Sequence, residues 1–341
     1  MEEKCTSRQL GVAVFAALLA PASALPGVVD RGGSLGWLGP VLGFPLTLLV
    51  LWRLDRLGRD GLGAALRQRL KGLSGLALTL YYIWAVGLSA LTAGSCVDRL
   101  SRTDYQEVPA WLLAVALAGV CAYLIYKGRG AFFRSAEIFY LILLVVLAVF
   151  LLLGAFHLRV ENLVPRSGEE WLGPVRGVLP AVSALSVGTL AAFFPRRARE
   201  PGESPLWRWL GGWCLAAAGL GLLVTGALGA PLAQKAPLPF FLALQGLGFP
   251  GGFQRLEALA TAAWVLSDLT LLGMAALAGR EMAGGSKWGA LAPLTGAVLG
   301  GCLLPNAVVR AAAPALMGIN LALGAALPLA ASLLPARKKG E

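Results

Sequence analysis

The sequence predicts an all-α integral membrane protein with ten transmembrane helices, arranged as a five-plus-five inverted repeat with broken helices 1 and 6. Three observations lead to this class. Hydrophobic residues make up 57% of the 341 residues and charged residues only 14%, whereas about a quarter of a soluble domain is charged. Ten apolar stretches follow one another with short connections. The first and the sixth stretch contain proline and small residues at matching places.

The apolar stretches are interpreted as helices because lipid offers backbone N–H and C=O groups no partner, and a helix satisfies them internally. About 20 apolar residues span the hydrocarbon core. The expected spans are 9–29, 35–52, 74–97, 109–126, 135–156, 174–194, 208–230, 254–279, 288–305 and 312–334.

The distribution of basic residues predicts the orientation. Twenty of the 29 lysines and arginines lie on one side of the membrane. This side holds the N-terminus, the C-terminus and the loops that connect spans 2 and 3, 4 and 5, 6 and 7, and 8 and 9. Basic residues stay in the cytoplasm, so we expect both termini to be cytoplasmic. Five spans fall in residues 1–160 and five in 161–341, within a single membrane domain. An odd number of spans per half inverts the second half relative to the first, as in inverted-repeat transporters.

Proline and small residues interrupt the first span at 21–27 and the sixth at 180–188. A broken helix exposes N–H groups where a half-helix begins and carbonyl oxygens where one stops. These ends suit the carboxylate and the ammonium of an amino acid near the membrane midplane. The alternative is that proline and glycine merely kink packed helices, but two breaks at corresponding spans favour a site. The expected ligand-binding residues are Pro21, Ala22, Ser23, Ala24, Tyr82, Ser183, Ser186, Gly188 and Thr189.

Asp268 lies inside the eighth span, where a carboxylate costs about 2.5–3.5 kcal/mol on insertion scales and should face a cavity or a partner. We expect Asp268, with Ser267, to bind a coupling proton or the ammonium of a ligand. The alternative is a structural Asp268 bonded to neighbouring hydroxyls. Tyr81 and Tyr82 lie in the third span, where one hydroxyl reaches toward a central ligand or both belong to the interfacial aromatic belt.

Other functional classes find little support in the sequence. It contains no paired carboxylates at helical spacing inside a span, no His–carboxylate pair and no phosphate-binding glycine loop, so we expect no enzyme and no cofactor. His157 and five cysteines without a CxxC motif do not predict a metal site. The net charge of +11 is explained by membrane orientation and by lipid contacts rather than by nucleic acid.

The loop between the second and third spans is basic, with leucines at 54, 57, 62, 66 and 70. This pattern predicts an amphipathic helix that lies on the cytoplasmic leaflet with its apolar face in lipid; docking onto a partner protein is the alternative. Small residues four apart, such as Gly296 and Gly300, predict a helix-packing surface.

Six short blocks occur in order along the chain: KCTSRQL at 4–10, AEI at 136–138, ENLVP at 161–165, PLPF at 237–240, QRLEAL at 254–259 and LLPN at 303–306. This ordered set, together with ten spans, resembles the permease-like B subunits of bacterial spore germinant receptors. The sequence departs from that family where Thr189 follows Gly188 in place of an acidic residue, and where Asp268 replaces an apolar residue.

The resemblance implies the amino acid–polyamine–organocation superfamily fold and a location in the spore inner membrane. It also implies A-type and C-type receptor subunits as partners, and an amino acid or similar germinant as ligand. Three functions follow: a receptor subunit that binds a nutrient and triggers germination, a proton-coupled amino-acid transporter, and a structural scaffold of the receptor complex.

Overall fold

The structure is a computed structural model that describes residues 5–23, 32–57, 60–103, 105, 107–165, 168–196, 206–236, 238–246, 256–304 and 306–335. Within these residues helices form nearly all of the chain, and β-pairing is limited to one bridge between Cys5 and Arg196. The all-α prediction is confirmed. The longer helices are α1 (Ser7–Ser23), α3 (Gly39–Arg56), α5 (Ser74–Thr103), α6 (Ala110–Lys127), α7 (Arg129–Ala155), α8 (Gly173–Ser186), α9 (Leu206–Leu228), α12 (Leu256–Met282), α13 (Leu291–Leu303) and α14 (Asn306–Leu321).

Short elements connect or extend these helices. They are η1 (Gly33–Leu38), α4 (Leu62–Arg69), η2 (Lys71–Leu73), η3 (Val160–Asn162), η4 (Gly168–Leu172), η5 (Val187–Phe193), α10 (Ala230–Lys235), α11 (Pro239–Gln245), η6 (Lys287–Ala290), the π-helical η7 (Ala322–Ala326) and α15 (Leu327–Leu333).

Eight helical segments of the described chain are long and apolar enough to cross a membrane. They correspond to the second to eighth and the tenth expected spans. The other two expected spans give shorter apolar helices: α1 has 17 residues and α13 has 13. The outer faces of the long helices carry exposed Leu, Ile and Val side chains, for example Leu141, Val145 and Leu152 on α7. Such a surface suits lipid rather than water.

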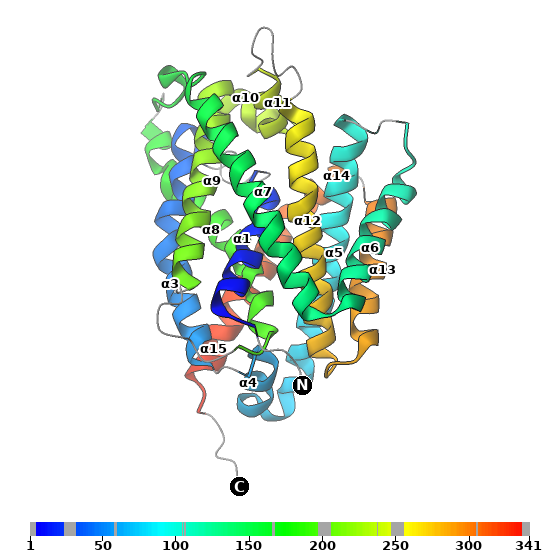
Figure 1. Cartoon of the computed structure of the whole chain (residues 1–341). Helices are drawn as coiled ribbons and strands as arrows, with labels where there is room; N and C mark the ends of the chain where they lie inside the picture. The colour runs from blue at the N-terminus through cyan, green and yellow to red at the C-terminus, as the bar shows by residue number, and fades with distance from the viewer. Residues whose placement is uncertain are drawn as a thin grey trace.

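The helices form one bundle around α1 (Figure 1). α1 packs against α7, α9 and α12, and α5 packs against α12 and α13. Gly296 and Gly300 of α13 face the backbone of Val86 and Ala90 on α5, so closely that a Cβ at Gly300 would overlap Ala90. The predicted small-residue packing surface is therefore confirmed, and it explains how the short α13 stays attached to the bundle.

The loop after α3 differs from the expectation of a helix lying in lipid. Leu62 and Leu66 share one face of α4 and are buried against the protein, where α4 contacts α5, η5 and α15. Arg69 then donates to the carbonyls of Ala331, Ser332 (3.1 Å) and Leu334 (2.7 Å) at the end of α15. A cation that bonds the last carbonyls of a helix stabilises that end, so α4 clamps α15. We call this end of the bundle, seen at the bottom of Figure 1, the α4 end.

Candidate functional site

Ser267 of α12 bonds to the backbone of α1 just before Pro21. Its hydroxyl donates to the carbonyl of Ala16 at 2.5 Å and accepts the amide N–H of Ala20 at 2.8 Å. A regular α-helix pairs those two backbone groups with each other. Pro21, which has no N–H, lies one residue further on and removes the next bond of the ladder. α12 therefore supports α1 at the point where the sequence predicts a break.

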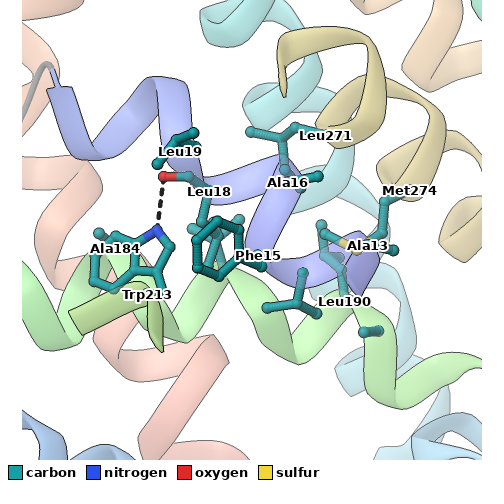
Figure 2. Close-up of a cluster of buried hydrophobic side chains, with 14 of the residues drawn as sticks. Ala13, Phe15, Ala16, Leu18, Leu19, Ala184, Leu190, Trp213, Leu271 and Met274 are labelled. Carbon is teal, nitrogen blue, oxygen red and sulfur yellow. Dashed lines mark hydrogen bonds between the residues drawn. The ribbon is translucent and has the colours of Figure 1, made fainter. Parts of the chain in front are cut away.

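A second side chain, from α9, reaches the same turns of α1. The indole N–H of Trp213 donates to the carbonyl of Leu18 at 2.9 Å, as Figure 2 shows. Trp213 is fully buried and lies beside Phe15 and Ala184 in the hydrophobic cluster that α1 forms with α8, α9 and α12 (Figure 2). The final turns of α1 are thus held by three hydrogen bonds with two side chains of other helices.

The sixth span is irregular, but not where proline was expected to break it. Pro180 lies inside α8, and the α-helix continues through it to Ser186. From Val187 the chain tightens into the 3-10 helix η5, with both junction residues in the right-handed helical conformation. The prediction of an unwound break that presents a fresh helix N-terminus is therefore wrong for this span. The irregularity is a tightened turn two residues before Thr189.

The π-helical segment η7 lies beside this junction. Thr189 donates its hydroxyl hydrogen to the carbonyl of Gly324 at 2.6 Å, and Tyr81 of α5 donates to the carbonyl of Leu323 at 2.6 Å. A π-bulge releases carbonyls from the i→i−4 ladder and often marks a functional site. Gly324 packs so tightly on Ser186 that a Cβ would overlap it. We call the contacts of Tyr81, Ser186 and Thr189 with residues 323–324 the polar junction. It joins α5, α8, α14 and α15.

A cavity of about 70 Å³, partly open to the outside, lies beside η5. Its lining is mainly apolar, as is usual for small-molecule sites. α1 contributes Leu10 and Val14, and the second half of α3 and the start of α9 contribute mainly leucine and valine. The end of α8, η5 and Arg196 form the remaining wall. Three predicted ligand residues, Ser186, Gly188 and Thr189, line this cavity.

The hydroxyl groups in the cavity wall all donate their hydrogens to backbone carbonyls. Ser186 donates to Val182 at 2.7 Å, Thr189 donates to Gly324, and Thr47 donates to Gly43 at 3.0 Å. Each hydroxyl has a single hydrogen. These oxygens therefore offer a ligand lone pairs and no donor.

Two donors in the wall have no partner among the described residues: the Nε of Arg196 and the indole nitrogen of Trp209, both buried. Arg196 is 7% exposed, and its Nη1 donates to Asp55 at 2.9 Å. A buried donor without an acceptor costs about 1–3 kcal/mol. Gly11 of α1 makes room for the Trp209 ring, because any Cβ there would overlap the indole. The cavity is thus an apolar chamber with a buried cation and a second donor in its wall, near the α4 end.

Asp268 lies elsewhere. Its carboxylate forms a buried ion pair with Arg99 of α5, and Asp268 and Arg99 are 2% and 5% exposed. Neither residue lines the cavity. Asp268 was expected to face a cavity or a partner, and it faces a partner. That partner is the guanidinium of Arg99 and not a neighbouring hydroxyl. The predicted pair Ser267 and Asp268 therefore contacts two different elements, α1 and α5.

The other predicted ligand residues that the structure describes lie apart from the cavity lining. Ser183 donates to the carbonyl of Met317 in α14 at 3.4 Å. Tyr82 packs beside Gly279 of α12, while the neighbouring Tyr81 is the one that reaches the polar junction. Pro21 and Ala22 are in the last turn of α1. Ala24 and the side chain of Ser23 lie outside the described residues.

Sequence reasoning missed Arg99, Arg196 and Trp209. Arg99 was placed just beyond the third span, but α5 continues to Thr103 and brings it inside the bundle. Arg196 was counted as one of several orientation charges, and Trp209 as part of an apolar span. Only the packing of α3, η5 and α9 in space shows that Arg196 and Trp209 line the same cavity. No group of three or more His, Cys, Asp or Glu side chains placed to hold a metal occurs in the part of the chain that the structure describes.

These features define an all-α integral membrane protein with an internal cavity beside irregular helices. The family model described as "Spore germination protein" matches residues 14–280, so the chain belongs to the spore germination protein family. Comparison with the curated proteins gives no match. The family is of the permease and receptor type rather than an enzyme family, and the chain is a germination-related membrane protein.

Proposed function

We propose that this chain is the membrane subunit of a germinant receptor, which binds an amino acid or similar small nutrient in the cavity between α1, α3, η5 and α9 and thereby triggers germination. The observation that carries the proposal is the cavity itself, because three residues expected to bind a ligand line it at the point where α8 becomes irregular. A-type and C-type receptor subunits are the proposed partners, and the spore inner membrane, with both termini cytoplasmic, is the proposed location.

Contacts between helices support a ten-helix, five-plus-five inverted repeat. Exchanging the first five helices (α1, α3, α5, α6, α7) with the second five (α8, α9, α12, α13, α14–α15) maps many of the contacts onto one another, although the extensive α1–α12 contact has no comparable counterpart between α8 and α5. The contact α1–α9 has its counterpart in α8–α3, α1–α7 in α8–α14, α7–α12 in α14–α5, and α7–α9 in α15–α3. The pairs α3–α9, α5–α12 and α6–α13 map onto themselves, and all three are in contact. This correspondence is expected of two repeats related by a pseudo-two-fold axis.

The polar junction connects the cavity wall with the α4 end of the bundle. Ser186 and Thr189 line the cavity, and Thr189 also bonds the carbonyl of Gly324 in η7. α15, which follows η7, is clamped by Arg69 of α4. A ligand that shifts η5 would therefore act on η7 and on the α4 end. Two packed arrangements of such an element can be biased by a ligand that favours one of them.

Asp268 has a different proposed role. A carboxylate already paired with Arg99 and remote from the cavity is poorly placed to carry a proton together with a ligand. Its position favours a receptor over a proton-coupled transporter, in which ligand and ion sites adjoin. We therefore assign Asp268 and Ser267 to holding α12 against α5 and α1.

The test is the thermal stability of the purified chain with a panel of amino acids, because a ligand that binds the folded state raises the melting temperature. Ala192→Phe fills the cavity from η5, and Leu215→Phe on the exposed face of α9 is the matched control. We expect one or more amino acids to stabilise the wild type and Leu215→Phe but not Ala192→Phe. Stabilisation of all three would place the ligand elsewhere. Uptake of the stabilising amino acid by proteoliposomes would support the transporter instead, and no stabilisation would support the scaffold.

A further inference from the structure

The cavity offers a ligand two kinds of polar atom, N–H donors and neutral oxygen acceptors, and only the donors include a charged group. Arg196 and Trp209 supply the unpaired donors, of which one is charged, and neither side chain has an acceptor. Ser186, Thr189 and Thr47 supply oxygens whose hydrogens are already used. Among the described residues, no carboxylate side chain lines the cavity. A negative group therefore meets a buried guanidinium, whereas a positive group meets only neutral oxygens.

We propose that the cavity binds a monocarboxylate with an aliphatic body, and that Arg196 and Trp209 receive its carboxylate near the α4 end. The amino group of an amino acid is then unnecessary for binding. This inference rests on the proposed function only in placing the nutrient in this cavity. A charge-assisted hydrogen bond from a buried guanidinium is among the strongest that a protein forms, and the leucine and valine side chains of the wall suit a branched or linear alkyl chain.

Asp55 at the end of α3 gives the site a competing anion. It bonds Nη1 of Arg196, so the Nε remains for a ligand, and its side chain is 71% exposed against 8% for Arg196. A solvated partner is held weakly. Removing its charge leaves the guanidinium entirely to the ligand, so Asp55→Asn is expected to tighten carboxylate binding. A purely structural ion pair predicts the opposite, because Asp55→Asn would then resemble loss of Arg196.

The experiment is calorimetric titration of the purified full chain in lipid nanodiscs. The probes are 4-methylpentanoate, its neutral amide, 3-methylbutylamine and L-leucine, with decanoate incorporated in the nanodisc as the membrane-derived carboxylate. We expect 4-methylpentanoate to bind at least as tightly as leucine, and the amide and the amine to bind at least tenfold more weakly. Decanoate that displaces 4-methylpentanoate identifies a membrane source, and its failure to do so identifies a soluble one. Equal binding of the carboxylate and the amide overturns the proposal, as does the absence of carboxylate binding.

Variants test the two residues. Arg196→Gln should abolish carboxylate binding, and Trp209→Phe, which keeps the ring and removes the N–H, should weaken it roughly tenfold, as for one hydrogen bond to a charged group. Trp207→Phe and Arg208→Gln are matched controls on the exposed face of the same helix and should bind normally. Asp55→Asn should bind severalfold more tightly, which also shows that a variant at this ion pair folds. Unchanged binding by Arg196→Gln overturns the proposal.

The outcomes separate this inference from the proposed function. If Ala192→Phe removes amino acid binding but Arg196→Gln does not, the nutrient pocket stands and the carboxylate assignment fails. If carboxylates bind through Arg196 while spores that carry Arg196→Gln germinate normally, the assignment stands and the cavity is not the nutrient pocket.

Discussion

The buried pair of Arg99 and Asp268 predicts a large and specific response to mutation. Both side chains are less than a tenth exposed and they bond each other across α5 and α12. Replacing one partner leaves an uncompensated charge inside the bundle, whereas replacing both leaves none. The variants are Arg99→Met, Asp268→Leu and the double variant, in which side chains of similar volume fill the space without charge.

The magnitude follows from burial. Removing one partner of a buried ion pair costs about 3–5 kcal/mol of unfolding free energy, whereas an apolar replacement of the whole pair is often neutral or stabilising. Each single variant should therefore lose about 3–5 kcal/mol, and the double variant should lie within about 2 kcal/mol of the wild type. The cycle then reports a strongly favourable coupling between the two positions.

The assay is reversible unfolding of the purified chain in mixed detergent micelles, followed by tryptophan fluorescence. The control is the pair Asp98 and Arg102 on the same helix, at 2.8 Å, where the side chain of Arg102 is half exposed. Exposed pairs four residues apart on a helix contribute about 0.3–0.5 kcal/mol, so the same changes there should alter stability little. A double variant that loses the sum of the two single losses would show that the charges do not act as a pair, and would refute the reasoning.

Three further predictions concern the helix contacts. Ser267→Ala removes both bonds to α1 and should cost about 1–3 kcal/mol; unchanged unfolding in the same assay would mean that these bonds do not stabilise the bundle. Gly300→Val should destabilise by about 1–3 kcal/mol through overlap with α5, whereas Gly119→Ala, which meets open space, should be neutral or mildly stabilising; equal effects would contradict the packing. Arg69→Gln should speed proteolysis near α15, and an unchanged cleavage pattern would show that the clamp is dispensable.

Much of the fold could be predicted from the sequence because lipid imposes one strong rule, that long apolar runs become helices. The second to eighth and the tenth spans follow from it directly. The small residues at Gly296 and Gly300 also identified a packing face correctly, since close backbone approach needs the absence of a side chain. The apolar face of the helix in the loop between the second and third spans was predicted to lie in lipid, but it packs against protein. The sequence pattern of an amphipathic helix is the same in both cases.

The site was predicted less completely, for reasons of geometry. Proline at 180 was expected to break a helix, but α8 tolerates it and tightens at Val187 instead. The partner of Asp268 lay 169 positions away along the chain, on a helix whose end was placed too early. Arg196 and Trp209 carry no motif, and their importance comes from one N–H on each, the Nε of Arg196 and the indole nitrogen of Trp209, that has no acceptor within the described residues. Unsatisfied bonding capacity is a property of packing and has no pattern in the sequence.

The central claim is that a nutrient in the cavity between α1, α3, η5 and α9 controls germination. The most direct measurement is the loss of optical density of spores that carry Ala192→Phe, Leu215→Phe or the wild-type chain, with equal amounts of the chain in the spore membrane verified by immunoblot. The account predicts that the nutrient response is lost in Ala192→Phe and retained in Leu215→Phe, while germination triggered independently of the receptor is unchanged. A normal nutrient response in Ala192→Phe spores would contradict it.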